Sequence, residues 1–111
     1  MDFNKIHHVA IICSNYEISK EFYVEKLGFE IIREIYREER QSYKLDLKLG
    51  ESQIELFSFP NSPKRPSYPE ACGLRHLAFE VDDIEEAVKE LKGKNFTLKS
   101  HAIHFIASSS H

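Results

Sequence analysis

Short apolar runs of β-type pattern recur through the first half of the chain. Residues 6–13, with the sequence IHHVAIIC, form a run rich in β-branched side chains, which predicts a strand. Residues 42–49, SYKLDLKL, alternate apolar and polar side chains, and residues 52–59, SQIELFSF, follow after a turn at Gly50. A fourth strand is predicted over residues 29–37, FEIIREIYR.

A helix is predicted between the strand over residues 6–13 and the strand over residues 29–37. Asn15 or Ser14 can cap its start, and Gly28 supplies the stop at its C-terminal end. Five of its residues fall at helical spacing on one face. These residues are Tyr16, Ser19, Phe22, Tyr23 and Leu27. The segment 4–59 is therefore predicted to be a β-α-β-β-β module.

All the prolines of the chain, at positions 60, 63, 66 and 69, fall in residues 60–73, which we interpret as a linker or ordered loop. The order of elements then starts again. Residues 74–81, LRHLAFEV, predict a strand, and Asp82 or Asp83 caps a helix over 84–92 that ends at Gly93. Residues 95–100, NFTLKS, predict another strand.

The two halves match at an offset of 68 positions. This shift places His8 on His76, and it brings Ala10 onto Ala78 and Tyr23 onto Leu91. Because the histidine, the alanine and the helix face all match at this one offset, the pattern favours tandem duplication. We therefore predict one α+β domain over residues 1–111. It would hold two β-α-β-β-β modules, of which the second, residues 74–106, is incomplete.

Composition narrows the class of protein. Of the 111 residues, 41% are hydrophobic, and the formal net charge of −3 comes from mixed acidic and basic side chains. Without a basic stripe, nucleic-acid binding has little support. The apolar runs are far shorter than a membrane span, and the first residues do not have the pattern of a signal peptide. Together with only two cysteines, Cys13 and Cys72, this predicts a cytoplasmic protein with reduced thiols.

Strand alternation places a candidate site on one face. His8 lies on the face of Ala10, and His76 on the face of Ala78, while Glu55 shares its face with two phenylalanines. Two histidines and a carboxylate are a usual ligand set for a borderline divalent ion. The alternative is that each histidine is a hydrogen-bonded core residue and that the glutamate is solvated. The adjacent His7 is expected to point toward the helix side, at the surface or behind the ligands.

Four strings of the sequence together resemble the glyoxalase branch of the vicinal oxygen chelate superfamily: HHVAI, EISKEFYVEKLGFEII, IELFSF and GLRHLAFEVDD. The resemblance covers roughly residues 4–99. It implies paired β-α-β-β-β modules whose curved sheets enclose a divalent metal such as Ni, Zn, Co, Fe or Mn. By motif position His8, Glu55 and His76 would be the metal ligands. Glyoxalase I members isomerise the hemithioacetal of methylglyoxal and a thiol to a lactoyl thioester, and a homodimer is implied.

The end of the chain departs from the family pattern. The 68-residue offset puts the counterpart of Glu55 near position 123, beyond His111. In the family this second glutamate is the fourth ligand and a candidate catalytic base, so the catalytic residue here stays unassigned. Residues 101–111, HAIHFIASSSH, form an atypical tail, which we expect to reflect truncation or a frameshift. Either the tail is partly disordered, or His101, His104 or His111 supplies the fourth ligand.

Three functions therefore stay open. The first is a glyoxalase I-like enzyme with a small-molecule substrate such as a thiol adduct, inactive in this form if the missing second glutamate is essential. Sister chemistries on the same scaffold include epimerisation of methylmalonyl-CoA and ring-cleaving dioxygenation. The second is a non-catalytic protein that binds a small molecule or antibiotic. The third is a vestigial domain that persists as a swapped dimer, because missing strands leave an open sheet edge.

Overall fold

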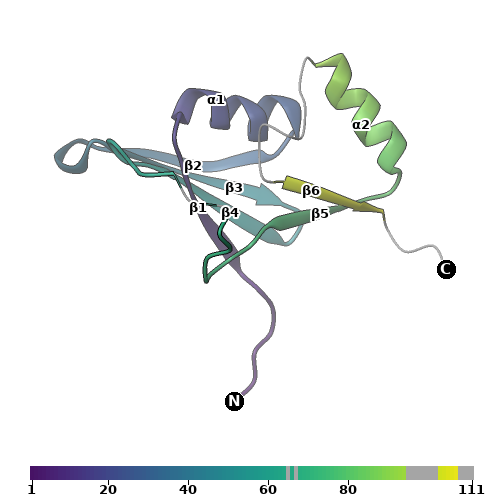
Figure 1. Ribbon diagram of the computed structural model, residues 1–111, viewed down its shortest axis with the longest axis horizontal. Coiled ribbons are helices and arrows are strands. Elements are labelled where there is room, and N and C mark those ends of the chain that lie inside the picture. The colour runs from purple at the N-terminus through teal and green to yellow at the C-terminus, as the bar shows by residue number, and fades with distance from the viewer. Residues whose placement is uncertain (65, 67, 95–102, 108–111) are drawn as a thin grey trace. The chain divides into compact units, whose positions relative to one another are not determined.

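The computed structural model describes residues 1–64, 66, 68–94 and 103–107 (Figure 1). It divides into two compact units, residues 1–65 and 66–111, whose boundary lies inside the predicted linker. The first unit contains β1 (His8–Cys13), α1 (Tyr16–Lys20), the π-helical η1 (Glu21–Lys26), β2 (Glu30–Arg37), the short η2 (Glu38–Arg40), β3 (Ser42–Leu49) and β4 (Ser52–Ser58). The second contains β5 (Leu77–Val81), α2 (Ile84–Gly93) and β6 (Ile103–Ala107).

The strands of the first unit form one four-stranded sheet in the order β1-β4-β3-β2. β1 and β4 run parallel, whereas β4, β3 and β2 are joined as antiparallel neighbours. A parallel pair needs a crossover connection, which α1, η1 and the β2–β3 hairpin provide. The predicted α+β class and the β-α-β-β-β order of this module are confirmed.

Local sequence signals set the ends of the first helical segment. The Ile18 backbone N–H donates to Asn15 Oδ1 at 3.1 Å, so Asn15 is the N-cap. The helix continues into η1, where the Leu27 N–H donates to the Phe22 carbonyl at 2.9 Å. This i to i−5 hydrogen bond makes a wider turn than that of an α-helix. Gly28 then adopts a φ of 77°, a left-handed conformation that a side chain would strain.

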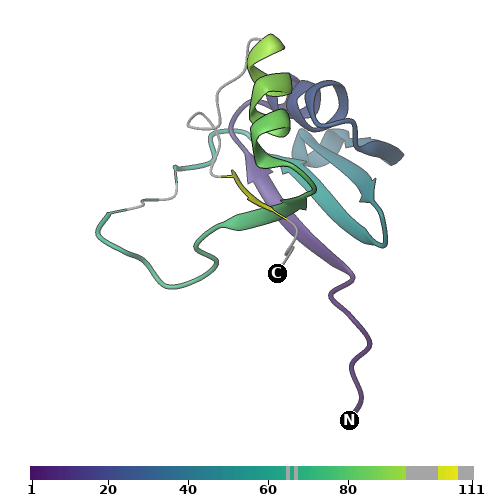
Figure 2. The same ribbon diagram turned by 90° about the vertical axis from the view of Figure 1, so that its right-hand side faces the viewer.

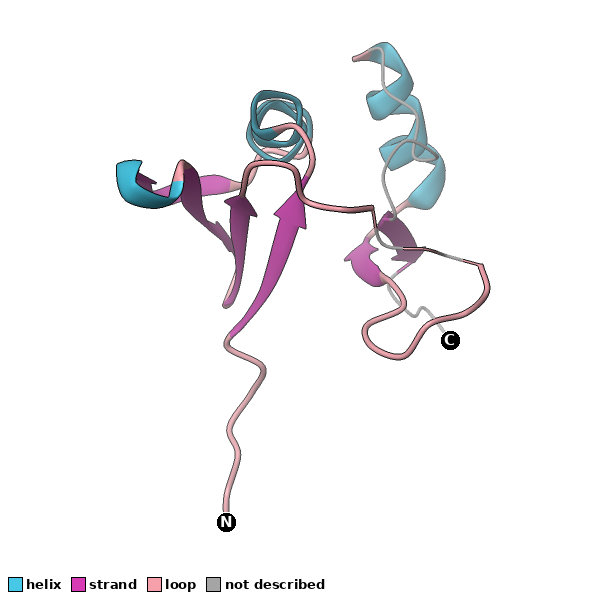
Figure 3. Cartoon of the chain, turned by 60° about the vertical axis from the view of Figure 1, so that its left-hand side comes forward, coloured by secondary structure: helices cyan, strands magenta, loops and turns pink. Residues whose placement is uncertain are grey.

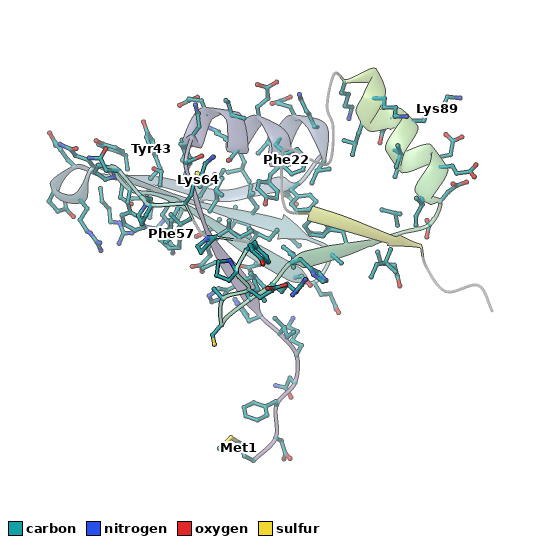
Figure 4. All side chains as sticks on the ribbon, viewed as in Figure 1. Met1, Phe22, Tyr43, Phe57, Lys64 and Lys89 are labelled. Carbon is teal, nitrogen blue, oxygen red and sulfur yellow. The ribbon has the colours of Figure 1, made fainter. Side chains whose placement is uncertain are left out.

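The core of this unit lies between the helical segment and one face of the sheet (Figure 3). Phe22 is buried in it, and β3 and β4 contribute Leu45, Leu47, Ile54 and Leu56. Figure 4 shows Phe22 and Tyr43 on the helix side of the sheet and Phe57 on the opposite side. Because strand side chains alternate, the polar residues between these leucines lie on the opposite face of the sheet.

Tyr16, Lys20 and Glu34 tie the helix to β2. The Tyr16 hydroxyl donates a short hydrogen bond to Glu34 Oε2, and Lys20 Nζ lies 2.8 Å from the same oxygen. The hydrogen bond from Lys20, followed by that from Tyr16, lowers the pKa of Glu34. Burial and the nearby Glu34 carboxylate raise the pKa of Tyr16, so its hydroxyl remains a donor. Tyr16 also stacks on Tyr43, with ring centroids 4.2 Å apart.

In the second unit β5 and β6 pair as parallel strands, and α2 connects them (Figure 2). The Glu86 backbone N–H donates to Asp83 Oδ1 at 3.2 Å, which makes Asp83 the N-cap of α2. The predicted strand over 95–100 lies outside the described residues. Within the predicted atypical tail, residues 103–107 form a strand that pairs with β5 along its whole length, and residues 101–102 and 108–111 lie outside the described residues. For residues 103–105 and 107 only the backbone is described.

The two units share one register relationship. In the first, Ala10 of β1 is directly opposite Glu55 of β4. In the second, Ala78 of β5 is directly opposite His104 of β6, again in a parallel pair. His104 therefore occupies the register position that Glu55 holds in the first unit. Among the described residues, no helix is both long and apolar enough to cross a membrane.

Candidate metal and substrate site

The face of the four-stranded sheet opposite its helical segment, which we call the site face, carries several of the candidate residues. Cross-strand partners share a face, so the registers define its members. They are His8, Ala10 and Ile12 of β1, Glu30, Arg33, Ile35 and Arg37 of β2, Ser42, Lys44, Asp46 and Lys48 of β3, and Gln53, Glu55 and Phe57 of β4. The sequence-based placement of His8 and Glu55 on one face agrees with these registers.

His8 and Glu55 come together on this face. His8 Nε2 lies 3.5 Å from Glu55 Oε2, and the two side chains are 41% and 18% exposed. A carboxylate that is largely withdrawn from water needs a cationic or hydrogen-bonding partner. The imidazole is the partner that the first unit supplies, and the exposed His8 ring leaves the pair open to solvent on one side.

The separation of these two atoms fits a shared divalent ion. Nitrogen and carboxylate oxygen ligands each lie about 2.1 Å from a zinc ion, so two of them at a tetrahedral angle are about 3.4 Å apart. His8 Nε2 and Glu55 Oε2 already have nearly this spacing. The donor set, one imidazole nitrogen and one carboxylate oxygen, also suits borderline metals. The residues present therefore fit part of a metal site.

His7 contacts the ring of His8. The two Nδ1 atoms lie 3.0 Å apart and the rings meet edge to face. One Nδ1 must carry the proton and the other must accept it. When His8 offers its Nε2 lone pair to an ion, its Nδ1–H is the donor and His7 accepts. His7 is exposed and immediately precedes β1, which agrees with its expected place at the surface or behind the ligands.

Asp46 is a site-face residue that the sequence reasoning missed. It is the direct cross-strand partner of Glu55 in the β3–β4 pair. Its Oδ1 is buried and has no hydrogen-bond partner among the described residues, and the nearest cation, Lys44 Nζ, is 3.6 Å from it. Two carboxylates directly opposite each other repel, which costs stability unless a cation lies between or beside them. The alternation of residues 42–49 predicts the face of Asp46, but only the register pairs it with Glu55.

The other predicted residues are placed as follows. His76 immediately precedes β5 in the second unit and is exposed. In the described part of the chain, no three His, Cys, Asp or Glu side chains gather closely enough to hold an ion. His101 and His111 lie outside the described residues. His104 is placed only by its register position in β6.

Cys13 lies on the helix side of the four-stranded sheet and not on the site face, since its cross-strand partner is Ser58. It is buried at the end of β1, and Cys72 is exposed in the loop before β5. Burial raises the pKa of the Cys13 thiol, so it stays protonated at neutral pH and is a poor nucleophile.

Comparison with known proteins gives the class. The model of the Glyoxalase/Bleomycin resistance protein/Dioxygenase superfamily matches residues 5–106. The chain belongs to this superfamily, which is also called the vicinal oxygen chelate superfamily.

Three proteins illustrate what this chain is similar to. It is 63% identical over 95 residues to the uncharacterized protein YwkD of Bacillus subtilis, covering 85% of this chain and 74% of that protein. A glyoxalase family protein from Enterococcus faecalis has a similar crystal structure, with a TM-score of 0.78 and 57% identity over 86% of this chain and 75% of that one. The mitochondrial methylmalonyl-CoA epimerase of Dictyostelium discoideum is 30% identical over 82% of this chain and 57% of its own length.

Proposed function

We propose that this protein is a metal-dependent enzyme that moves a proton at a carbon next to a carbonyl group. Its substrate would be a small molecule with two vicinal oxygens, in the first instance the hemithioacetal of methylglyoxal and a thiol, as for glyoxalase I. The observation that carries this proposal is the 3.5 Å approach of His8 Nε2 to Glu55 Oε2 on the site face. Membership of the superfamily supports it.

We assign His8, Glu55 and His76 as the residues that hold the ion. A bound divalent ion would stabilise the negative charge that develops on the substrate oxygens as the neighbouring proton leaves. His8 contributes a neutral nitrogen whose orientation is fixed by its contact with His7, and Glu55 contributes negative charge. Ni, Zn, Co, Fe and Mn all fit such nitrogen and oxygen donors, and the homodimer implied by the family resemblance remains part of the proposal.

Asp46 is our candidate for the proton acceptor. It lies beside Glu55 on the site face, and its buried Oδ1 has a lone pair that no described donor occupies. A general base must first be within reach of the proton it removes, and adjacent positions across a sheet are about 5 Å apart. Lys44 Nζ lies 3.6 Å from Asp46 Oδ1 and is the cation that contacts it in the described part of the structure.

A second candidate function is epimerisation of an acyl thioester of the methylmalonyl-CoA kind. The 30% identity to the epimerase of Dictyostelium discoideum favours it. The two reactions share their first step, since both remove a proton from a carbon next to a carbonyl group: the hemithioacetal carbon beside the ketone in one, and the carbon beside the thioester carbonyl in the other. They differ in where the proton returns, so the same residues serve either reaction and the substrate decides between them.

Incubation in D₂O with each substrate separates these possibilities. The metal-loaded full chain would be given methylglyoxal with glutathione, methylglyoxal with other low-molecular-weight thiols, or methylmalonyl-CoA, and deuterium incorporation would be followed by NMR. We expect turnover of one substrate class, lost by at least about 100-fold in Asp46→Asn and Glu55→Gln, with Glu25→Gln as a matched surface control. Stoichiometric metal binding without exchange of any substrate would instead indicate the non-catalytic binder.

A further inference from the structure

Two arginines lie over two phenylalanine rings at one end of the site face. The Arg37 guanidinium carbon is 5.8 Å from the centre of the Phe57 ring, and that of Arg40 is 4.9 Å from the centre of the Phe59 ring. The two rings stack on each other with centroids 6.0 Å apart and planes within 7°. We call these four residues the arginine–phenylalanine cluster. Cation–π contacts of this kind orient a guanidinium without neutralising it.

The cluster is continuous with the proposed metal site. Phe57 follows Glu55 by two positions on the same strand face, and Phe59 follows the end of β4. Two residues of an extended strand span about 7 Å, so the cluster begins about 7 Å from Glu55 and extends to about 14 Å. Arg37 reaches the same face from the end of β2, where it is the cross-strand partner of Ser42. Figure 4 shows Phe57 on the side of the sheet away from the helix.

The positive charges of this cluster are not matched by carboxylates. Arg37 Nε is buried and has no hydrogen-bond acceptor among the described residues. Glu38 and Glu39 separate the two arginines in the chain, but no ion pair joins them to Arg37 or Arg40 in the described part of the structure. A buried donor without an acceptor is rare in native proteins and calls for an explanation such as a ligand.

We propose that the arginine–phenylalanine cluster binds an oxyanion, a phosphate or a carboxylate, at the far end of the substrate. This inference rests on the proposed function, because the metal-binding pair would hold the reacting oxygens of the same molecule. Planar guanidinium groups match the geometry of both oxyanions and bind them by charge-assisted hydrogen bonds. The substrate would then carry its anionic group about 7–14 Å from the reacting carbon. Simple methylglyoxal hydrate would be too short to reach it.

The test uses the full chain without metal, so that it does not depend on the ion. Pyrophosphate and succinate would be titrated separately while the arginine Nε–H signals are followed by NMR. We expect saturable shifts of Arg37 and Arg40, with affinity reduced about tenfold in Arg37→Gln and in Arg40→Gln. Tighter binding of pyrophosphate than of succinate would assign the site to a phosphate, and the reverse order would assign it to a carboxylate.

Two comparisons make the result decisive. Arg33→Gln removes an arginine from the same face and strand outside the cluster, and should leave both affinities unchanged. Arg37→Lys keeps the charge and stem, so it separates loss of the guanidinium from loss of folding. Absence of saturable shifts, or an equal loss in Arg33→Gln, would overturn the oxyanion site. Because no metal is present, either outcome is independent of whether His8 and Glu55 bind an ion.

Discussion

The two units of the chain begin alike and end differently. Each opens with a histidine and an alanine two positions later, and each caps its helix with a short polar side chain, Asn15 or Asp83. The first unit then builds a four-stranded sheet, whereas the second has a two-stranded one among the described residues. Both nevertheless pair the first strand with a parallel partner in the same register. The shared part of the module is therefore the strand pair that positions the site.

The units also differ in how much they bury. The first has a core of aromatic and aliphatic side chains between its helical segment and sheet. In the second, Leu91 is the only fully buried apolar side chain among those described. Two strands alone are marginally stable in water, whereas four strands packed on a helix bury enough apolar surface to hold a shape. The first unit is thus the part that can fix a site geometry by itself.

The largest effect is expected from the core of the first unit. Leu56 is fully buried on β4, next to Glu55, so Leu56→Ala leaves a cavity. We expect the free energy of unfolding to fall by about 3 kcal/mol, measured by urea denaturation. Ile106→Ala in β6, where the side chain is exposed, should cost less than about 0.5 kcal/mol. Equal losses in the two variants would contradict the contrast between the units.

The register equivalence of Glu55 and His104 predicts a ligand role for His104. We expect His104→Ala to weaken divalent metal binding by about 100-fold, and His104→Glu, which recreates the residue type found at Glu55, to bind at least as tightly as the parent chain. Isothermal titration of Ni²⁺ and Zn²⁺ into the metal-free chain measures this. The matched controls are His101→Ala and His111→Ala. A loss in either control as large as in His104→Ala would show that register does not identify the ligand.

His7 gives a smaller effect, specific to the first unit. His76 is preceded by Arg75, so the second unit has no counterpart of the His7–His8 contact. His7→Ala removes the acceptor that orients the His8 ring, and we expect about tenfold weaker metal binding. Nitrogen NMR of His8 would show a mixture of tautomers where the parent chain shows one. Unchanged affinity together with an unchanged tautomer would remove His7 from the site.

The smallest expected effect concerns the link between helix and β2. Because Lys20 and Tyr16 hold the pKa of Glu34 below its usual value, their contribution to stability is present above the unfolded-state pKa. It is lost as the pH falls through the lower folded-state pKa. Lys20 and Glu34 are about one-third exposed, so we expect a contribution of only about 0.5 kcal/mol. Glu34→Gln should remove it at pH 7 and should have no further effect at a pH where Glu34 is already protonated. In the second unit Ile84 stands at the position that matches Tyr16, so no such pH dependence should arise there.

The sequence predicts what depends on neighbours along the chain. The caps at Asn15 and Asp83, the stop at Gly28 and the alternation of β3 and β4 are local, and the structure agrees with them. The features that the sequence does not predict depend on pairing between distant strands or on a single rotamer. Alternation puts Asp46 on a polar face, but only the β3–β4 register sets it opposite Glu55. Similarly, β6 is a short run whose strand character depends on β5, from which 21 residues separate it.

The proposed function depends on the binding of a divalent ion by His8 and Glu55 on the site face. Cobalt(II) tests this binding most directly, because its visible absorption reports the nitrogen and oxygen donors around it. We expect the metal-free chain to take up about one equivalent of Co²⁺ with a d–d spectrum. His8→Ala and Glu55→Gln should each abolish that spectrum, while Glu25→Gln should retain it. An unchanged spectrum in His8→Ala, or no uptake by the parent chain, would show that these two residues do not bind the ion.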